Sequence, residues 1–527
     1  MPEPVIARTI DELVRSRAAH DGPKPVVVDP VSQMSYRELE MTTSDLTARF
    51  VEAGVGKGTR VGLIMPNSVR WVQVAIALTR IGAVLVPLST LLKAGELVSQ
   101  LKAASVQFLM SVEEFRGHRY LDNLQSALKL REFGDEPLQC PELPALRQVW
   151  TPDGLARAGA GERARAIAHA LTQTVTAADP LVIMFTSGSS GVPKGVIHSH
   201  GNALGAVQSG LAARCITSET RLYLPMPFFW VGGFGSGILS ALLAGATLVT
   251  EEIARPETTL RLLETERVTL FRGWPDQAEA LARHAETVGA DLSALRPGSL
   301  EALLPPEQRA APGARATLFG MTEAFGPYCG FPADTDMPAT AWGSCGKPFP
   351  GMEVRIVHSG GEPVPAGTVG AIQIRGPHTL RGICRRSREE LFTPDGFYPT
   401  GDLGSLNEDG FLFYHGRSDD MFKVSGVTVY PSEVEGALRT IDGVVSAYVT
   451  NVSGAAGQRV GAAVVCNSAL TAEQLRNSAR NLLSAFKVPT VWLLLESDDD
   501  IPRSGTGKPD THRLREMLAV ADHQART

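Results

Sequence analysis

Two periodicities of apolar positions alternate along the first part of the chain. Residues 38–54 and 68–82 show helical spacing, whereas 60–66 and 83–89 are short runs rich in β-branched residues. Strands that alternate with helices of this length are typical of βαβ units and a largely parallel sheet. The alternation returns over 222–271, so we predict an α/β fold with stacked sheets.

The pattern changes in the second half of the chain. Short alternating runs separated by glycine and proline fill 343–414 and predict a small β-barrel, with a hairpin turn at Glu408–Gly410. After Gly416 a small α/β pattern begins. Capping-box sequences at Ser432–Glu435 and Thr471–Gln474 predict two helix starts there.

Composition excludes several classes of protein. The 527 residues carry a formal net charge of −6, whereas nucleic-acid-binding proteins usually have a basic excess. The six cysteines form no CxxC pair, and we expect reduced thiols in a cytoplasmic protein. The apolar stretch Val231–Thr250 is interrupted by glycines, which favours a buried helix and strand over a membrane span.

The strongest chemical signal is the string MFTSGSSGVPKGVIHSH at Met184–His200. An apolar strand leads into small hydroxyl residues and glycines, which can bring backbone N–H groups onto a polyphosphate. The loop is not a Walker P-loop, because Lys194 lies between Pro193 and Gly195. A flexible glycine turn is the alternative interpretation.

The same string resembles the phosphate-loop signature of the acyl-adenylating superfamily, which comprises acyl-CoA synthetases, adenylation domains and firefly-type luciferases. Four further motifs resemble that superfamily in the same order: FGMTE (319–323), YPTGD (398–402), GRSDDMFKVSGVTVYPSEVE (416–435) and PRSGTGKPD (502–510). The resemblance covers nearly the whole chain. It implies a large N-terminal domain over residues 1–416, a hinge at 417–420 and a small mobile C-terminal α+β lid domain over 421–527.

The resemblance assigns ATP-binding roles to particular residues. The phosphates are assigned to Thr186, Ser187, Gly188, Ser189, Ser190, Gly191, Lys194 and Thr322, and adenine to Phe319, Gly320 and Met321. Glu323 matches the Mg²⁺ ligand, and a carboxylate is the kind of ligand that Mg²⁺ prefers. Asp402 matches the ribose-binding aspartate and Arg417 the arginine that reaches ribose or phosphate. Core packing for Phe319 and a turn-stabilising role for Asp402 are the alternatives.

Two half-reactions are implied for the lid. Lys508 matches the lysine that acts in adenylation, Asp419 the hinge, and Lys423 and Gly426 the residues that face the site during thioester formation. The implied catalytic set is therefore Lys508, Lys423, Glu323 and Thr186. Without the resemblance, Lys508 would be interpreted as an exposed loop lysine, and Gly426 as a bulge glycine.

Three departures from the superfamily pattern stand out. Trp230 occupies the position in PFFW where histidine is common, and a shortened loop over Gly298–Pro306 would place Glu301 near the nucleotide. Either that loop takes another course or nucleotide binding is weakened. A basic cluster in 381–388 could hold the CoA 3′-phosphate, although a solvated loop is the preferred interpretation.

These observations predict an ATP-dependent acyl-CoA ligase that uses Mg²⁺, coenzyme A and a hydrophobic fatty, aromatic or polycyclic acid. The acyl pocket is predicted from Phe228, Phe229, Trp230, Gly232, Gly233, Phe325 and Gly326. An acyl-AMP ligase that loads a carrier protein and a catalytically weak nucleotide-binding protein are the alternatives. We expect neither a nucleic-acid partner nor a membrane span, and leave a homodimer open.

Overall fold

The computed structural model describes residues 7–130, 133, 137–157, 159–186, 194–418, 422–424, 427–454, 457–467, 470–483, 486–504 and 508–524. The chain divides into two compact units. The larger unit comprises Met1–Glu353 and Arg375–Tyr398, and the smaller unit comprises Val354–Ile374 and Pro399–Thr527. The predicted domain boundary at Gly416 and the hinge at 417–420 stay predictions.

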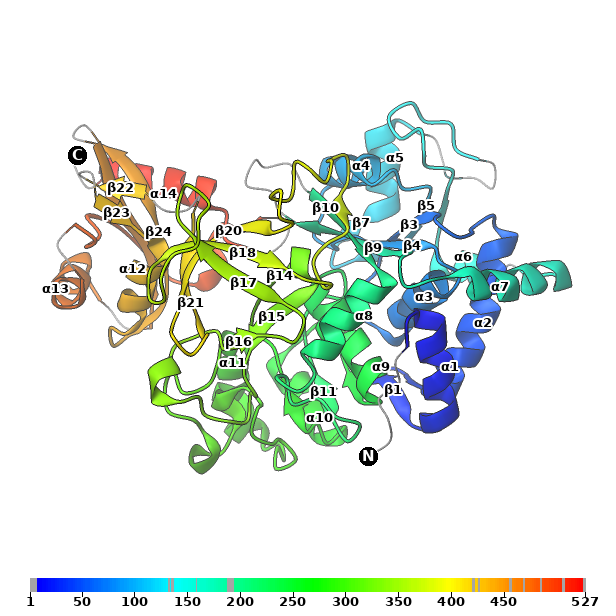
Figure 1. Cartoon of the computed structure of the whole chain (residues 1–527), viewed down its shortest axis with the longest axis horizontal. Coiled ribbons are helices and arrows are strands. Elements are labelled where there is room, and N and C mark those ends of the chain that lie inside the picture. Colours follow the sequence, from blue (N-terminus) through cyan, green and yellow to red (C-terminus); the bar gives the residue numbers. More distant parts are fainter. Residues whose placement is uncertain are drawn as a thin grey trace. The chain divides into compact units, whose positions relative to one another are not determined.

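The larger unit contains a seven-stranded sheet among its described strands (Figure 1). Its strands follow the order β19 (Gly382–Ile383), β10 (Lys194–Ser199), β9 (Pro180–Thr186), β4 (Val84–Pro87), β3 (Arg60–Ile64), β5 (Phe108–Ser111) and β8 (Gln148–Trp150). From β9 to β8 the strands are parallel, as predicted, whereas β10 is antiparallel to both of its neighbours. Strand β4 is buried on both faces, since Leu85 packs in one hydrophobic core and Val84 and Val86 in another.

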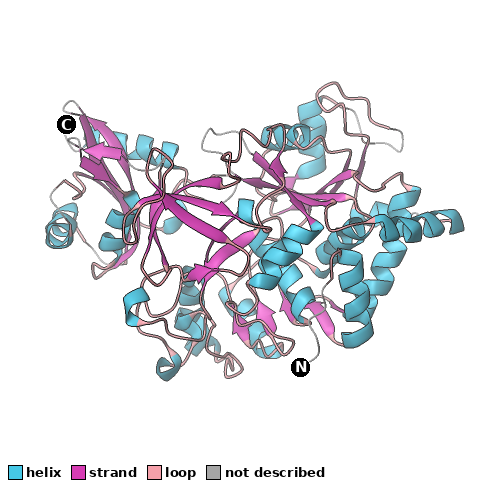
Figure 2. Ribbon diagram, in the orientation of Figure 1, coloured by secondary structure: helices cyan, strands magenta, loops and turns pink. Residues whose placement is uncertain are grey.

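A second sheet in this unit has five described strands. Their order is β13 (Leu270–Phe271), β11 (Arg221–Tyr223), β12 (Thr247–Val249), β1 (Pro25–Val28) and β2 (Gln33–Ser35). Helix α3 (Val69–Arg80) contacts both β4 of the first sheet and β1 of the second, so it lies between the two sheets. The predicted stacking of α/β sheets is confirmed (Figure 2).

Several helices of the larger unit begin at a residue whose side chain caps the helix. Ser35 and Glu38 form a capping box at the start of α2 (Tyr36–Glu52), and the Ser68 side chain caps α3. The remaining α-helices are α1 (Ile10–Asp21), α4 (Ala94–Ala103), α5 (Tyr120–Leu128), α6 (Pro152–Arg157), α7 (Glu162–Thr174), α8 (His200–Ser209), α9 (Ser240–Ala244), α10 (Pro256–Thr265) and α11 (Pro275–Val288). A π-helical segment, η1, spans Gly232–Leu239 and continues into α9.

The stretch Val231–Thr250 is therefore helical and then extended, as predicted, and it ends in β12. Within the part of the chain that the structure describes, no helix has both the length and the apolar character needed to cross a membrane.

The other described sheets are small, and the one formed by residues 353–417 falls largely in the region for which a β-barrel is predicted. In the larger unit, β14 (Phe319–Met321), β15 (Gly326–Gly330) and β16 (Lys347–Pro348) form one sheet, and β6 (Glu114–Phe115) pairs with β7 (His118–Arg119). The smaller unit carries a sheet in the order β17 (Glu353–Val357), β18 (Gly370–Arg375), β20 (Tyr398–Leu406) and β21 (Leu412–Arg417). In the described residues this sheet is not closed into a barrel, and the turn at Glu408–Gly410 joins its last two strands as predicted.

The C-terminal part of the smaller unit is α+β, as predicted. Its three-stranded sheet has β25 (Gly457–Cys466) between β24 (Val444–Gly454) and β26 (Val491–Leu495), and β22 (Phe422–Val424) pairs with β23 (Val427–Val429). Helices α12 (Pro431–Arg439) and α13 (Ala472–Leu482) share one core with the sheet, and α14 (Thr511–Gln524) packs in a different core.

One of the two predicted capping boxes is wrong. Thr471 and Gln474 cap α13 as expected, whereas α12 is preceded by Tyr430, which makes no side-chain cap. The Ser432 hydroxyl instead donates to the carbonyl oxygen of His415, and the Glu435 carboxylate accepts from the Val449 N–H. The side chains of Ser432 and Glu435, which the local pattern assigned to the cap, therefore bond to residues elsewhere in the fold.

Candidate functional site

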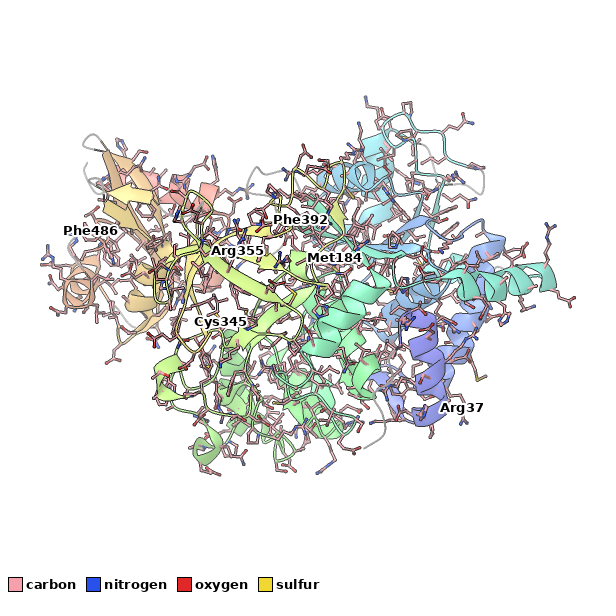
Figure 3. The ribbon with its side chains drawn as sticks, in the orientation of Figure 1. Arg37, Met184, Cys345, Arg355, Phe392 and Phe486 are labelled. Atoms are coloured by element: carbon pink, nitrogen blue, oxygen red, sulfur yellow. The ribbon has the colours of Figure 1, made fainter. Side chains whose placement is uncertain are left out.

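The proposed phosphate loop connects β9 to β10, the two strands of an antiparallel hairpin. Thr186 lies opposite Lys194 in this hairpin, and both side chains are half-buried. Met184, labelled in Figure 3, lies on β9. The predicted phosphate-binding residues Ser187, Gly188, Ser189, Ser190 and Gly191 lie outside the described residues. The structure thus places the two ends of the proposed loop side by side.

A buried histidine connects this hairpin to the FGMTE motif. His198 on β10 donates through Nε2 to the carbonyl oxygen of Thr322, and its Nδ1 accepts from the Asn202 amide, both at 2.7 Å. Because a carbonyl oxygen can only accept, the proton of the neutral ring resides on Nε2. Burial lowers the pKa of His198 to about 4, so the ring is neutral at physiological pH. His198 therefore fixes the backbone next to Glu323.

Glu323 is nearly buried, with an exposed fraction of 9 %. Its Oε1 accepts a hydrogen bond from the Tyr398 hydroxyl at 3.4 Å, and its backbone oxygen accepts from the Leu380 N–H at 2.7 Å. Among the described residues, no lysine or arginine forms an ion pair with this carboxylate. A desolvated carboxylate is costly without a cation, and a hard divalent cation such as Mg²⁺ is the partner that its oxygens suit.

The predicted adenine platform lies on β14. Phe319 packs edge-to-face against Tyr328, with ring centroids 5.5 Å apart, and both Phe319 and Met321 are half-buried. A Cβ at Gly320 would lie 2.1 Å from the backbone oxygen of Gly326, so the pairing of β14 with β15 itself requires glycine. The adenine-binding role of these residues stays a prediction.

In the smaller unit, Asp402 and Arg417 lie opposite each other on β20 and β21. The Arg417 Nη1 is 3.2 Å from the Asp402 carboxylate and donates to the Thr400 carbonyl oxygen at 3.1 Å. Asp402 is buried, and its N–H donates to the Thr400 hydroxyl. The structure thus brings together Asp402, which the resemblance assigned to ribose, and Arg417, which it assigned to ribose or phosphate.

The two predicted catalytic lysines lie on different segments of the smaller unit. Lys508 is exposed, and its backbone oxygen accepts from the Ser504 N–H at 2.8 Å. Lys423 lies on β22, but its side chain, Gly426 and the predicted hinge residue Asp419 are outside the described part of the structure. Their roles stay predictions.

The predicted acyl-pocket residues gather around η1 in the larger unit. Phe228 is fully buried against Trp71, with ring centroids 5.3 Å apart, whereas Trp230 is half-buried and packs edge-to-face against Trp274 at 5.7 Å. Phe325 is buried and packs against the ring of His198. Trp230 is therefore better placed than Phe228 and Phe325 to form a wall, because Phe228 and Phe325 are both buried core residues.

Glycine is required within the π-helical segment as well. A Cβ on Gly233 would lie 2.1 Å from the backbone oxygen of Pro227, so a larger residue would displace the loop that carries Phe228 and Trp230. Gly232 begins the same segment, and Gly326 follows Phe325 at the start of β15. π-helical turns often occur at functional sites.

The shortened loop at Gly298–Pro306 takes its own course. Two short helical turns span Glu301–Leu303 and Pro306–Gln308, while Leu303 and Leu304 are buried in a hydrophobic core. The Glu301 carboxylate accepts a hydrogen bond from the Ala310 N–H at 2.9 Å, so this acid is engaged within its own loop. This arrangement favours the first of the two predicted outcomes, a rerouted loop.

Sequence reasoning did not single out His198, Asn202 or Tyr398 as functional residues. His198 and Tyr398 occur inside the quoted motif strings, but a histidine or tyrosine in a strand is more often part of a core. The carbonyl of Thr322 and the carboxylate of Glu323, which they contact, come from distant parts of the sequence. A local sequence pattern does not reveal such contacts.

Comparison with known proteins decides the family. The model of the family described as AMP-binding enzyme matches residues 14–384. The chain belongs to the AMP-binding enzyme family. This confirms the predicted family and the prediction that the protein is an enzyme.

Individual relatives extend the similarity over almost the whole chain. The chain is 30 % identical to the 3-[(3aS,4S,7aS)-7a-methyl-1,5-dioxo-octahydro-1H-inden-4-yl]propanoyl:CoA ligase of Mycobacterium tuberculosis, over 97 % of this chain and 98 % of that protein. It is also 30 % identical to a feruloyl-CoA synthase of an Amycolatopsis species, over 90 % of this chain and 92 % of that protein.

A solved structure agrees on the fold. O-succinylbenzoate coenzyme A synthetase of Bacillus subtilis, determined with ATP and a magnesium ion, superposes with a TM-score of 0.78 at 22 % identity, covering 95 % of this chain and 99 % of that chain. At this identity the comparison establishes a shared AMP-binding-enzyme fold. The names of the two 30 % identical relatives agree with the predicted reaction, CoA thioester formation.

Proposed function

We propose that this AMP-binding enzyme is an ATP-dependent acyl-CoA ligase for hydrophobic carboxylic acids. It joins the acid to the α-phosphate of ATP, releases pyrophosphate, and then transfers the acyl group from the acyl-AMP to coenzyme A. The observation that carries the proposal is Glu323, a nearly buried carboxylate without a basic partner among the described residues, held beside the phosphate-loop hairpin through His198 and Thr322.

The first half-reaction brings a carboxylate anion to a polyphosphate, so its barrier depends on charge neutralisation. Glu323 would hold Mg²⁺, which supplies positive charge to the phosphates when bound. Thr186 and Lys194, at the two ends of the loop, would contact the phosphate oxygens. Lys508 would stabilise the negative charge that develops as the acid oxygen attacks the α-phosphorus.

Asp402 suits the two ribose hydroxyls, because an ionised carboxylate is an acceptor for both. Arg417 holds that carboxylate in place from the neighbouring strand. In the second half-reaction the CoA thiol attacks the acyl carbon and AMP leaves, with Lys423 as the proposed lysine for this step.

A hydrophobic acid is supported by the aromatic surroundings of η1. Trp230 packs against Phe229 and Trp274, Phe325 packs against Phe234 of η1, and aromatic rings bury large apolar areas. The relatives whose names carry an indenyl propanoyl or a feruloyl group act on acids that contain rings. We therefore include aromatic and polycyclic acids in the proposed substrate class, together with fatty acids.

A cytoplasmic location forms part of the proposal, and six cysteines that form no disulfide are compatible with it. The sequence leaves a homodimer open, and the proposal does not depend on one.

Acid-dependent exchange of labelled pyrophosphate into ATP tests the first half-reaction without CoA. Exchange should appear with one or more ring-bearing or fatty acids, and CoA should then convert the accumulated acyl-AMP into a thioester. Exchange in the presence of acid, but transfer only to a carrier-protein thiol, would instead identify an acyl-AMP ligase. Absence of exchange with every acid would overturn the proposal.

A further inference from the structure

Two arginines of the larger unit lie away from any described carboxylate. Arg214 follows the end of α8 and is only 4 % exposed, and the half-buried Arg272 directly follows β13. Among the described residues, neither guanidinium is paired with an aspartate or a glutamate. Arginine does not deprotonate in proteins, so both sites carry a positive charge that lacks a nearby anion.

The ordinary interpretation of Arg214 is a helix cap. Its Nε donates to the Gly210 carbonyl oxygen at 3.1 Å and its Nη2 to that of Val207 at 2.6 Å, and the C-terminus of α8 favours a cation. The third nitrogen, Nη1, makes a contact outside the cap. It donates at 2.9 Å to the hydroxyl of Ser236, which lies in the π-helical segment η1.

Ser236 connects Arg214 to the predicted acyl pocket. Its hydroxyl lies 4.0 Å from the position that a Cβ on Gly326 would take, and the neighbouring Gly235 would bring a Cβ to 3.1 Å from the Phe325 ring. Phe325 and Gly326 are both predicted acyl-pocket residues. The Arg214 guanidinium therefore lies at the edge of that residue group.

Arg272 lies on the segment that carries Trp274. Its Nη1 donates to the Gly298 carbonyl oxygen at 2.7 Å, and two residues later Trp274 packs against Trp230. Burial first, and the positive charge of Arg272 second, lower the pKa of Arg214 to about 9. The two guanidinium groups are thus close enough to repel each other, and both remain charged at neutral pH.

We propose that Arg214 and Arg272 bind a second, anionic oxygen group of the acid substrate, remote from the carboxyl group that is activated. This inference rests on the proposed function and narrows its substrate class. The preferred acids combine an apolar ring system with a distal carboxylate or phenolate. A guanidinium suits such an oxyanion because it presents several N–H donors in one plane, and charged hydrogen bonds are stronger in desolvated surroundings.

A matched series of acids tests the proposal with the wild-type enzyme. The acids share one ring and one propanoate arm and differ only at the far ring position, which bears hydrogen, an acetyl group or a carboxylate. We expect kcat/KM for pyrophosphate release to be at least about 10-fold higher for the distal carboxylate than for hydrogen, with the acetyl compound between them.

Substitutions of the two arginines test the residues themselves. Arg272→Gln and Arg214→Gln should each reduce the carboxylate-to-hydrogen ratio toward one, whereas the exposed Arg261→Gln on α10 should leave that ratio unchanged. Because Arg214 also caps α8, the wild-type ratio and Arg272→Gln test the proposal independently of how Arg214→Gln folds.

The outcomes separate this proposal from the proposed function. Turnover of the hydrogen-bearing acid with no advantage for the carboxylate would overturn the distal subsite while leaving the ligase activity intact. A carboxylate advantage that survives both substitutions would also overturn it. Absence of pyrophosphate release with every acid would overturn the ligase proposal, and this one with it.

Discussion

The guanidinium of Arg417 lies 3.2 Å from the carboxylate of Asp402, directly across the β20–β21 pair. The same Nη1 donates to the carbonyl oxygen of Thr400, and the Thr400 hydroxyl accepts from the Asp402 N–H. These bonds fix the carboxylate of Asp402 on β20, the strand that begins at Tyr398. A carboxylate oriented in this way is suited to accept hydrogen bonds from a ribose diol.

Removing either Asp402 or Arg417 should weaken ATP binding. For Asp402→Asn and Arg417→Gln we expect KM for ATP to rise about 10- to 100-fold, because charged hydrogen bonds contribute about 1.5–3 kcal/mol. Steady-state pyrophosphate release at varied ATP measures this. Arg439→Gln, which removes an exposed i,i+4 ion pair on α12, is the matched control and should leave KM unchanged. An unaltered KM for ATP in Asp402→Asn would show that the pair is only structural.

Glu323 should determine the magnesium requirement. In Glu323→Gln the carboxamide lacks the negative charge that binds a hard cation, so we expect kcat/KM to fall at least about 10²-fold. We also expect half-maximal activity to need more Mg²⁺. Titrating Mg²⁺ at fixed ATP tests this, with Tyr398→Phe as the control that removes only the hydroxyl donor. Equal Mg²⁺ dependence in Glu323→Gln and wild type would contradict the metal-binding role.

The two lysines should fail in different half-reactions. Lys508→Ala should slow adenylation about 10²–10³-fold, the usual loss for one charge-stabilising donor, and still convert synthetic acyl-AMP with CoA. Lys423→Ala should form acyl-AMP but consume it slowly. Single-turnover thioester formation from synthetic acyl-AMP in both variants distinguishes the steps. Equal impairment of that step would argue for one conformation throughout and against a hinge at Asp419.

Long, regular patterns predicted the fold well. The spacing of apolar residues predicted α2 and α3, and continuous β-branched runs predicted β3 and β4. In these elements the residues that face the core recur at a regular spacing, which is visible in the sequence. The capping box at Ser432 was wrong because its hydroxyl bonds to His415, a residue distant in sequence. The predicted barrel is a four-stranded sheet, since local runs do not reveal how far a sheet closes.

The candidate site could likewise be predicted only in part. Motif strings identify Glu323, Asp402 and Arg417, and the structure adds the ion pair between the last two. His198 and Arg214 could not be found in this way, because each acts through contacts with residues of other segments. A single histidine in a strand or arginine after a helix carries no periodic signal.

Buried histidines should make folding stability depend on pH. Burial lowers the pKa of His198 and of His200 to about 4, below the ordinary value near 6.5. As pH falls from about 6.5 to 4, the unfolded chain binds protons that the folded chain does not, so stability is lost in this window, by up to about 3 kcal/mol per histidine.

Urea unfolding at pH 7.5, 5.5 and 4.5 measures this loss. His200→Gln should lose less stability over the window than wild type, whereas His358→Gln, which changes an exposed histidine, should follow the wild-type curve. Identical pH slopes in wild type and His200→Gln would show that His200 is not held neutral by burial.

The central claim is that this chain couples ATP cleavage to CoA thioester formation through an acyl-AMP. The most direct test is product stoichiometry in one reaction with ATP, Mg²⁺, CoA and an acid that supports pyrophosphate exchange. Mass spectrometry and chromatography should find acyl-CoA, AMP and pyrophosphate in equal amounts, with acyl-AMP accumulating only when CoA is omitted. Formation of ADP and phosphate, or acyl-AMP that persists in the presence of CoA, would contradict the account.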